Sequence, residues 1–379
     1  MPLSSNGTTR DKRFAMNRHR VLFLLKVASI FLCLYLFVVG VGGMGEAFKL
    51  FGKDFADRVL TATSNPLTAL FIGILATSLV QSSSTSTSII VGMVAGGALS
   101  LEGAVFMIMG ANIGTSITSM LVSLGHASRP EELRRAFSAS TVHSSFNLCA
   151  ALVLFPLELA TGYLRHTAKL CGDLFEGVGG MRLSNPLKAA TEPTIDFLAW
   201  IVQGQPILLL VLTIVLTYGM LLCIVKLLRS LVLHKLEAFF DKHLFRNWRR
   251  AMFFGLFFTF AVQTSSVPTA LVVPLAAAGI LRLAQVYPYC LGSNMGTTMT
   301  AMLAALATGN SVAIVAAFSH LLFNVTGIVV IWSIPPLRRI PMRIAEFCGN
   351  TAFHKRWFPF AVVAGIYFII PFLGILLLP

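Results

Sequence analysis

The stretch Val80-Gln81-Ser82-Ser83-Ser84-Thr85-Ser86-Thr87 is a polar run inside an otherwise apolar region. The apolar segments on either side, residues 67–79 and 89–99, are each about half of the roughly 20 residues that a helix needs to cross a bilayer. The pattern predicts a re-entrant helical hairpin over residues 67–99, with the polar run at its tip. Irregular backbone at membrane depth is tolerated only beside protein or water, so the tip is a candidate site. A Ser/Thr-rich turn between short helices would explain a single such run equally well.

The polar run occurs a second time, 182 residues later, as Val262-Gln263-Thr264-Ser265-Ser266-Val267-Pro268-Thr269. The same offset relates Gly-x-Asn-x-Gly-Thr at 110–115 to its copy at 292–297, and Thr118 to Thr300. A His-x-x-Phe-Asn segment at 143–147 recurs at 320–324 after a five-residue slip. Three motifs in the same order indicate an internal duplication. The second hairpin is therefore predicted over residues 251–281.

The composition is that of a polytopic membrane protein. Of 379 residues, 56% are hydrophobic and only 12% are charged, against about 25% charged in soluble domains. The formal net charge is +14, but the basic residues lie in the connections between apolar segments, as the positive-inside rule requires. We therefore expect a lipid bilayer and no nucleic acid as partner. The six cysteines are scattered without Cys-x-x-Cys spacing, so no metal site or disulfide framework is expected, and no cofactor.

Counting spans from a cytoplasmic amino terminus gives the expected organisation. The first hairpin then enters from outside and the second from inside, so we predict an all-α polytopic membrane protein with two inverted-topology repeats, each containing a re-entrant helical hairpin and broken helices. Secondary transporters use this arrangement, with the substrate site between the repeats. The predicted segments are a basic cytoplasmic tail (1–20), a first span and outer amphipathic segment (21–63), repeat 1 (64–158, with hairpin 67–99 and spans 102–123 and 136–158), an extracytoplasmic loop (159–204), a span and basic cytoplasmic connection (205–250), repeat 2 (251–334, with hairpin 251–281 and spans 283–307 and 311–334), and a cytoplasmic linker with the last span (335–379).

Three local expectations concern helix ends and breaks. Asn65 and Pro66 are expected to begin the first hairpin, because Asn caps helices and Pro suits a first turn. Gly110, Asn112 and Gly114 are expected to loosen their helix at mid-depth and to release backbone carbonyls for a ligand. Glu158, at the end of a predicted span, is expected to be solvated or to cap a helix.

The two tips predict an anion site that lacks a basic side chain. Each tip offers hydroxyls, and the helix that follows offers free N–H groups at the positive end of its dipole. Between Val59 and His126 the only formal charge is Glu102, and between Ala251 and Leu337 it is Arg282. An anion held by neutral groups would carry a large desolvation cost, which bound cations would offset. Hard cations prefer oxygen ligands, here the side chains of Gln81, Gln263, Thr115, Thr118, Thr297 and Thr300, with Asn112 and Asn294 orienting either ligand.

These motifs resemble the type II sodium-dependent phosphate cotransporter family, and most closely its shorter bacterial members. The likeness runs from about Asn65 to Phe368 and includes Thr191-Glu192-Pro193. It implies multi-pass insertion in the bacterial inner membrane and sodium-coupled symport of inorganic phosphate by alternating access, with no enzymatic step and Na⁺ as the co-transported ion. By resemblance, a sodium site comprises Gln263, Thr264, Ser265, Thr297 and Thr300, and the phosphate contacts are Ser82, Ser83, Ser84, Ser265 and Ser266. We add Gln81, Thr115, Thr118 and Asn147 to the sodium ligands, and Asn112 and Asn294 to the phosphate contacts.

Other functions are compatible with the bare residues. One is a sodium-coupled carrier of another small anion; others are a channel or a non-transporting receptor. A membrane-embedded serine hydrolase would need Ser293 or a tip serine beside His143 or His320, but no Gly-x-Ser-x-Gly elbow is present. Packing between helices would also explain single Ser, Thr or His residues. This chain differs from the family it resembles at one position of the first His-x-x-Phe-Asn segment: electrogenic vertebrate members carry an aspartate there, and this chain has Ser144. The sequence indicates no oligomeric state.

Overall fold

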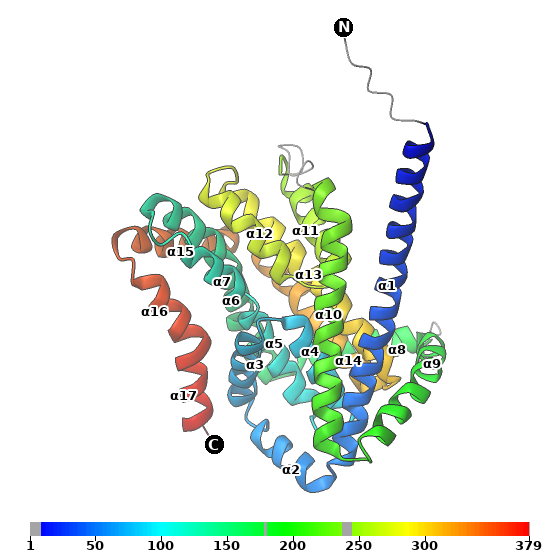
Figure 1. Cartoon of the computed structure of the whole chain (residues 1–379). Helices are drawn as coiled ribbons and strands as arrows, with labels where there is room; N and C mark the ends of the chain where they lie inside the picture. The colour runs from blue at the N-terminus through cyan, green and yellow to red at the C-terminus, as the bar shows by residue number, and fades with distance from the viewer. Residues whose placement is uncertain (1–8, 178–179, 237–244, 379) are drawn as a thin grey trace.

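The computed structural model describes residues 9–177, 180–236 and 245–378, and these residues form helices and short connections without a strand (Figure 1). Residues 1–8 of the predicted tail and Lys242 of the predicted basic connection lie outside the described residues. Within the described chain, six helical stretches are long and apolar enough to cross a membrane: Leu24–Leu50, Leu101–Leu124, Pro130–Thr161, Pro206–Ile224, Ser311–Trp332 and Phe358–Leu377. The chain is an all-α polytopic membrane protein, as predicted.

The first half of the chain contains one long helix, an amphipathic helix and the first hairpin with the helices that surround it. Helix α1 has 42 residues, about 63 Å at 1.5 Å per residue, and therefore extends well beyond a hydrocarbon core of about 30 Å. The elements are α1 (Thr9–Leu50), α2 (Lys53–Ala62), α3 (Pro66–Val80), α4 (Ser83–Ala95), α5 (Leu101–Gly114), α6 (Ile117–Leu124) and α7 (Pro130–Thr161).

The second half places its hairpin after a pair of connecting helices and a further long helix. Two π-helical segments, η1 and η2, interrupt its later helices. The elements are α8 (Tyr163–Gly177), α9 (Gly180–Ile201), α10 (Pro206–Leu236), α11 (Trp248–Val262), α12 (Ser266–Ala277), α13 (Leu283–Thr308), α14 (Ser311–Gly327), η1 (Ile328–Trp332), α15 (Pro335–His354), α16 (Phe358–Ala364), η2 (Gly365–Ile369) and α17 (Ile370–Leu377).

The duplication seen in the sequence is present in the hairpin helices. Helices α3 and α11 each have 15 residues and occupy positions related by the offset of 182. At about 22 Å each, they are too short to span a bilayer. Both begin at an asparagine cap: Asn65 Oδ1 accepts from Leu67 N at 3.0 Å, as predicted, and Asn247 Oδ1 accepts from Arg249 N at 3.1 Å. The α3–α4 and α11–α12 hairpins lie toward opposite ends of the bundle (Figure 1).

Gly110 and Asn112 do not loosen their helix, so that part of the expectation was wrong, whereas α5 ends at Gly114, where a break was expected. Helix α5 continues through Gly110, and α13 continues through the matching Gly292. A Cβ at Gly110 would overlap the Leu70 carbonyl of α3, and a Cβ at Gly292 would overlap the Met252 carbonyl of α11. Small residues let two helix backbones approach closely. The glycines therefore hold each hairpin's first helix against the span that follows it, and the break in the first repeat comes later, between α5 and α6.

The connections expected to be loops or linkers are largely helical. The segment 159–204 contains α8 and α9, and the segment after η1 contains α15. Helix α8 packs on α14, and α15 packs on α7, so each half covers the other's last span. Glu158 is buried at the end of α7: its carboxylate accepts from Leu164 N at 2.5 Å and from Arg165 Nε at 2.9 Å. It caps the start of α8, in agreement with the capping alternative, while Arg165 also pairs with Glu102 at 2.8 Å.

Candidate functional site

Each hairpin tip turns at a glutamine in the left-handed conformation. The φ angles are 55° at Gln81 and 57° at Gln263, where non-glycine residues are uncommon. Each glutamine ends its helix, and its backbone N–H donates to the carbonyl four residues earlier, at 2.8 Å to Thr77 and 2.7 Å to Thr259. The turn directs the carbonyl of each glutamine away from its own helix. These two carbonyls are the centre of the candidate site.

The two tips are joined by a reciprocal pair of hydrogen bonds. Ser84 Oγ of the first tip donates to the carbonyl of Gln263 at 3.1 Å, and Ser266 Oγ of the second tip donates to the carbonyl of Gln81 at 3.1 Å. Ser84 and Ser266 are related by the offset of 182, as are the two glutamines. The contact between repeats is therefore itself two-fold symmetric. Hydroxyls from opposite halves of the chain meet at one place.

A threonine from the following span completes an oxygen cluster at each tip. Thr118 Oγ1 lies 3.4 Å from the Gln81 carbonyl. Thr300 Oγ1 lies 3.2 Å from the Gln263 carbonyl and 3.0 Å from the Gln263 side-chain Oε1. Neutral carbonyl and hydroxyl oxygens are the ligands that hard cations take in proteins. The structure thus brings together the predicted sodium ligands Gln81 and Thr118 on one side, and Gln263 and Thr300 on the other.

The helices that start at the tips differ in how their first N–H groups are used. At α4, Ser82 Oγ accepts from Thr85 N at 3.3 Å and lies 2.9 Å from Thr85 Oγ1, so the side chain caps the helix. At α12, Ser265 makes no side-chain cap, and its hydroxyl, although 1% exposed, has no hydrogen-bond partner. Buried hydroxyls are normally paired. The start of α12 therefore combines a buried, unpaired hydroxyl with the free N–H groups of half-buried Ser266 and Val267, which suits an anion.

The predicted asparagines lie away from the tips, in two matching clusters between the spans. Asn294 Oδ1 faces His143 Nε2 at 2.6 Å, and Asn294 Nδ2 donates to Asn147 Oδ1 at 2.6 Å. In the other half, Asn112 Oδ1 lies 3.3 Å from both His320 Nε2 and Asn324 Nδ2. Asn147 Nδ2 also donates to the Asn112 carbonyl at 2.6 Å, which links the two clusters. Each cluster thus combines a histidine and an asparagine from one repeat with an asparagine from the other, and all of these side chains are buried.

Other predicted ligands are close to the tips but bonded within their own helices. Thr115 Oγ1 donates to the Ala111 carbonyl at 2.8 Å, and Thr297 Oγ1 donates to the Ser293 carbonyl at 3.0 Å. Ser83 and Thr264 are buried at the tips, with 4% and 6% of their surfaces exposed. The arrangement therefore draws Gln81, Ser84, Gln263 and Ser266 into direct contact and leaves the two threonines turned toward their own backbones.

One buried contact was not anticipated from the sequence. Ser144 Oγ lies 2.8 Å from the hydroxyl of Tyr367, and both residues are buried. Tyr367 belongs to η2, a π-helical segment, and such segments are frequent at functional sites. The sequence offered no sign of this pairing, because no repeat or spacing relates the two residues. The last span therefore reaches the residue that follows His143.

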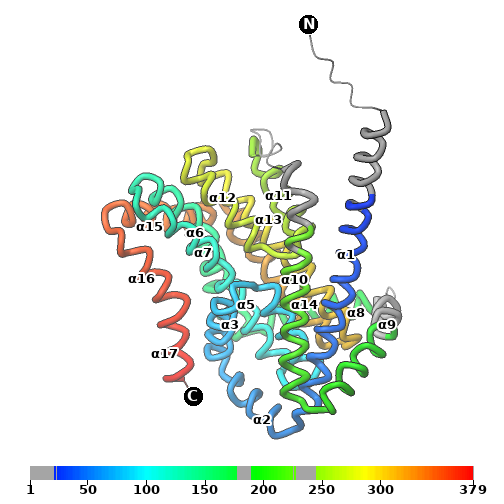
Figure 2. Tube along the Cα trace, viewed as in Figure 1, coloured from blue at the N-terminus to red at the C-terminus, as the bar shows by residue number. Residues whose placement is uncertain are grey.

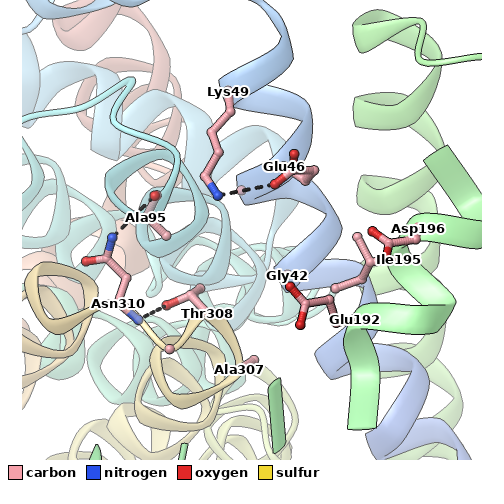
Figure 3. A pocket seen from close by; sticks show the side chains of 12 residues that line it. Gly42, Glu46, Lys49, Ala95, Glu192, Ile195, Asp196, Ala307, Thr308 and Asn310 are labelled. Carbon is pink, nitrogen blue, oxygen red and sulfur yellow. Dashed lines mark hydrogen bonds and ion pairs between the residues drawn. The ribbon is translucent and has the colours of Figure 1, made fainter. Parts of the chain in front are cut away.

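A separate pocket of about 220 Å³ lies outside the tips, between α1, α9 and the α13–α14 connection (Figure 3). Three carboxylates line it, those of Glu46, Glu192 and Asp196, and Lys49 pairs with Glu46 at 3.2 Å. Asn310 donates to the Ala95 carbonyl at the end of α4 at 3.4 Å, so this pocket adjoins the far end of the first hairpin. Its acidic lining is unfavourable for an anion. None of the tip residues lines it.

Comparison with known proteins identifies the family. The family described as Na⁺/Pi-cotransporter matches residues 36–184 and 215–333, well over half of the chain. Sodium-dependent phosphate transport protein 2A of Ovis aries is 35% identical over 92% of this chain and 67% of its own length. Sodium-dependent phosphate transport protein 2B of Homo sapiens is 33% identical over 89% of this chain and 63% of its own length. No solved structure matches the chain at a significant level. The chain spans about two thirds of the length of these relatives, and it belongs to the Na⁺/Pi-cotransporter family.

Proposed function

We propose that this chain is a secondary transporter that carries inorganic phosphate together with Na⁺ through the paired hairpin tips. The relatives are sodium-dependent phosphate transport proteins. The observation that carries the proposal is the uncapped start of α12, where the hydroxyl of Ser265 is buried and has no partner. Phosphate oxygens would accept from this hydroxyl and from the first N–H groups of α12. The neighbouring hydroxyl of Ser266, which now donates to Gln81, would provide a further donor.

Sodium would bind the two oxygen clusters beside the phosphate. The cluster of the second tip offers three oxygens, Thr300 Oγ1 and the two Gln263 oxygens that lie within hydrogen-bond range of it. That of the first tip offers the Gln81 carbonyl and Thr118. We place Thr115 and Thr297 in a supporting role because their hydroxyls contact carbonyls of their own helices and not the tip glutamines. Asn147, which contacts Asn112 and Asn294, and Thr264, which is buried at the tip, have the same role. Because neither hairpin segment, 67–99 or 251–281, contains a lysine or arginine, bound Na⁺ would be the source of positive charge.

The contacts do not favour a membrane-embedded hydrolase. That reaction would require a serine hydroxyl within hydrogen-bond reach of a histidine. The Nε2 atoms of His143 and His320 both face asparagines, and Ser293 Oγ lies 2.6 Å from Thr259 Oγ1. The histidines therefore orient amides. A carrier of another small anion remains the alternative function, since the tip groups recognise an oxyanion by hydrogen bonds alone.

Alternating access would follow from an inverted arrangement of the two repeats. The hairpins lie toward opposite ends of the bundle (Figure 1), and their tips meet through the bonds of Ser84 and Ser266. Opening would separate each tip from its partner on one side at a time. We further propose that the amino terminus is cytoplasmic and that the protein resides in a bacterial inner membrane, with the segment boundaries stated above.

The test is uptake of radiolabelled phosphate into proteoliposomes with and without an inward Na⁺ gradient. We expect uptake that requires Na⁺ and is inhibited by arsenate, which has the same shape and charge as phosphate. Ser265→Ala should raise the half-saturating phosphate concentration about tenfold, the value of one buried hydrogen bond to a charged group. Ser88→Ala is the matched control, because its buried hydroxyl is already bonded to the Ser84 carbonyl at 2.8 Å. Equal uptake with choline in place of Na⁺ would contradict sodium coupling, and equal phosphate affinity in the two variants would contradict the α12 site.

A further inference from the structure

An apolar pocket of about 450 Å³ lies between α1, α10, α11 and α13, apart from the acidic pocket described above. Its walls include Ile30 and Leu34 of α1, Ile224 of α10, and Met302 of α13. Almost all of the lining is aliphatic, aromatic or thioether, and the polar exception is Gln263. Both α1 and α10 contain stretches long and apolar enough to cross a membrane. The pocket is therefore continuous with the surface that these helices present to lipid.

Two lysines lie toward the same end of this pocket. Lys26 precedes Ile30 by four residues, so the two side chains lie on one face of α1. The helices α1 and α10 run antiparallel and side by side (Figures 1 and 2), and Cys33 of α1 contacts Cys223 of α10. Lys226 follows Cys223 by three residues, so it lies on the face of α10 that meets α1, a face beside the one that carries Ile224 into the pocket, and in the same direction along the pair as Lys26.

Neither lysine has an acidic partner among the described residues. The basic residues that form ion pairs among the described residues are Lys49, His126, Arg129, Arg134 and Arg165. Lys26 is half-buried and Lys226 is exposed. A lysine within an apolar span is costly unless its ammonium group reaches the interface or an anion. A lipid phosphate at the membrane interface would supply that anion.

We propose that this pocket binds one anionic phospholipid, with its headgroup at Lys26 and Lys226 and one acyl chain against Leu34 and Met302. The acyl chain would fill the apolar pocket, and the phosphate of the headgroup would pair with the two lysines. The methyl end of the acyl chain would rest against Gln263, the residue at which the second hairpin tip turns. The site is separate from the proposed phosphate site at the start of α12, and its existence does not depend on what is transported.

The experiment is native mass spectrometry of the purified full chain titrated with phosphatidylglycerol or with phosphatidylcholine of the same acyl chains. We expect one phosphatidylglycerol to be retained at least tenfold more tightly than phosphatidylcholine. Leu34→Trp, which fills the pocket, should abolish that preference, and Met302→Trp should do so from the opposite wall. Leu32→Trp is the matched control, because Leu32 lies on α1 but is 58% exposed.

The headgroup is tested by charge. The double variant Lys26→Gln with Lys226→Gln should weaken phosphatidylglycerol binding about tenfold or more, the value of two basic residues near an anionic lipid. Lys26→Arg with Lys226→Arg should retain it. Equal retention of the two lipids by the unmodified protein would overturn the proposal. So would normal phosphatidylglycerol binding by both tryptophan variants, since the lipid would then sit on the surface and not in the pocket.

Discussion

Replacing Gly292 by alanine tests whether close helix contact sets the geometry of the second tip. A methyl group at this position would overlap the Met252 carbonyl oxygen and would lie 2.7 Å from the Met252 carbonyl carbon and 2.9 Å from Leu256 N. Ordinary non-bonded contacts between such atoms are about 3.5–4.0 Å. Helices α11 and α13 would therefore have to separate by about 1 Å. Overpacking of this kind costs about 1–3 kcal/mol.

Separation of α11 and α13 would also move the candidate sodium ligands apart, because these residues lie on the same two helices. Gln263 ends α11, and Thr300 is on α13, with oxygen distances of 3.2 and 3.0 Å. An increase of about 1 Å takes both distances beyond hydrogen-bond range. We expect the half-saturating Na⁺ concentration for phosphate uptake to rise about fivefold, which corresponds to about 1 kcal/mol. The melting temperature in detergent should fall by about 2–6 °C.

The matched control is Gly219→Ala in α10, where an added methyl group would meet nothing within 4 Å. This substitution should leave Na⁺ dependence unchanged and should stabilise the helix slightly, since alanine is the better helix former. Both variants are measured by tracer uptake in proteoliposomes and by thermal unfolding. If Gly292→Ala matches Gly219→Ala in both assays, the close contact does not determine the tip, and the reasoning fails.

Three further predictions concern the tips and the last span. Gln263→Ala should raise the half-saturating Na⁺ concentration more than the half-saturating phosphate concentration measured at saturating Na⁺, because it removes the Oε1 atom 3.0 Å from Thr300. Identical shifts in both titrations would reject the assignment of Gln263 to Na⁺. In a cysteine-free background, Ser83→Cys should react with an impermeant thiol reagent from outside and Ser265→Cys from inside, both slowly because these positions are nearly buried, and labelling from one side only would reject the inverted repeats. Ser144→Asp should convert uptake with little or no net charge movement into electrogenic uptake on solid-supported membranes, and a current of one net positive charge per phosphate from the unmodified chain would refute this.

Much of the helical layout could be predicted because it depends on local pattern and length. The tip runs, the asparagine cap at Asn65 and the offset between α3 and α11 are all readable from one sequence. A helix too short to span, followed by hydroxyl residues and another short apolar segment, has few other solutions in a bilayer. The helical nature of α8, α9 and α15 was harder to predict, because amphipathic segments at a membrane surface resemble polar loops in hydropathy.

The contacts between repeats could not be predicted, because they depend on how the two halves are placed in space. Nothing in the sequence shows that Ser84 donates to the carbonyl of Gln263 and not to its own tip. The prediction at Gly110 was wrong for a related reason. Gly110 is compatible with a loosened helix when one helix is considered, and its close packing, like that of Gly292, becomes visible only when α3 and α11 are in place. The link between Ser144 and Tyr367 joins positions more than two hundred residues apart and follows no repeat.

The symmetry of the tips and its one departure together bear on charge balance. The two oxygen clusters are related by the duplication, and each combines a glutamine carbonyl with a threonine hydroxyl. The helix starts are not equivalent: Ser82 caps α4, whereas Ser265 leaves α12 uncapped. We infer that the site suits two Na⁺ ions and one phosphate dianion, whose charges sum to zero. Each net charge moved through the full membrane potential is worth about 2.3 kcal/mol per 100 mV. A loaded site with no net charge has no such free-energy contribution. The loaded protein can then change from outward-facing to inward-facing independently of the membrane potential.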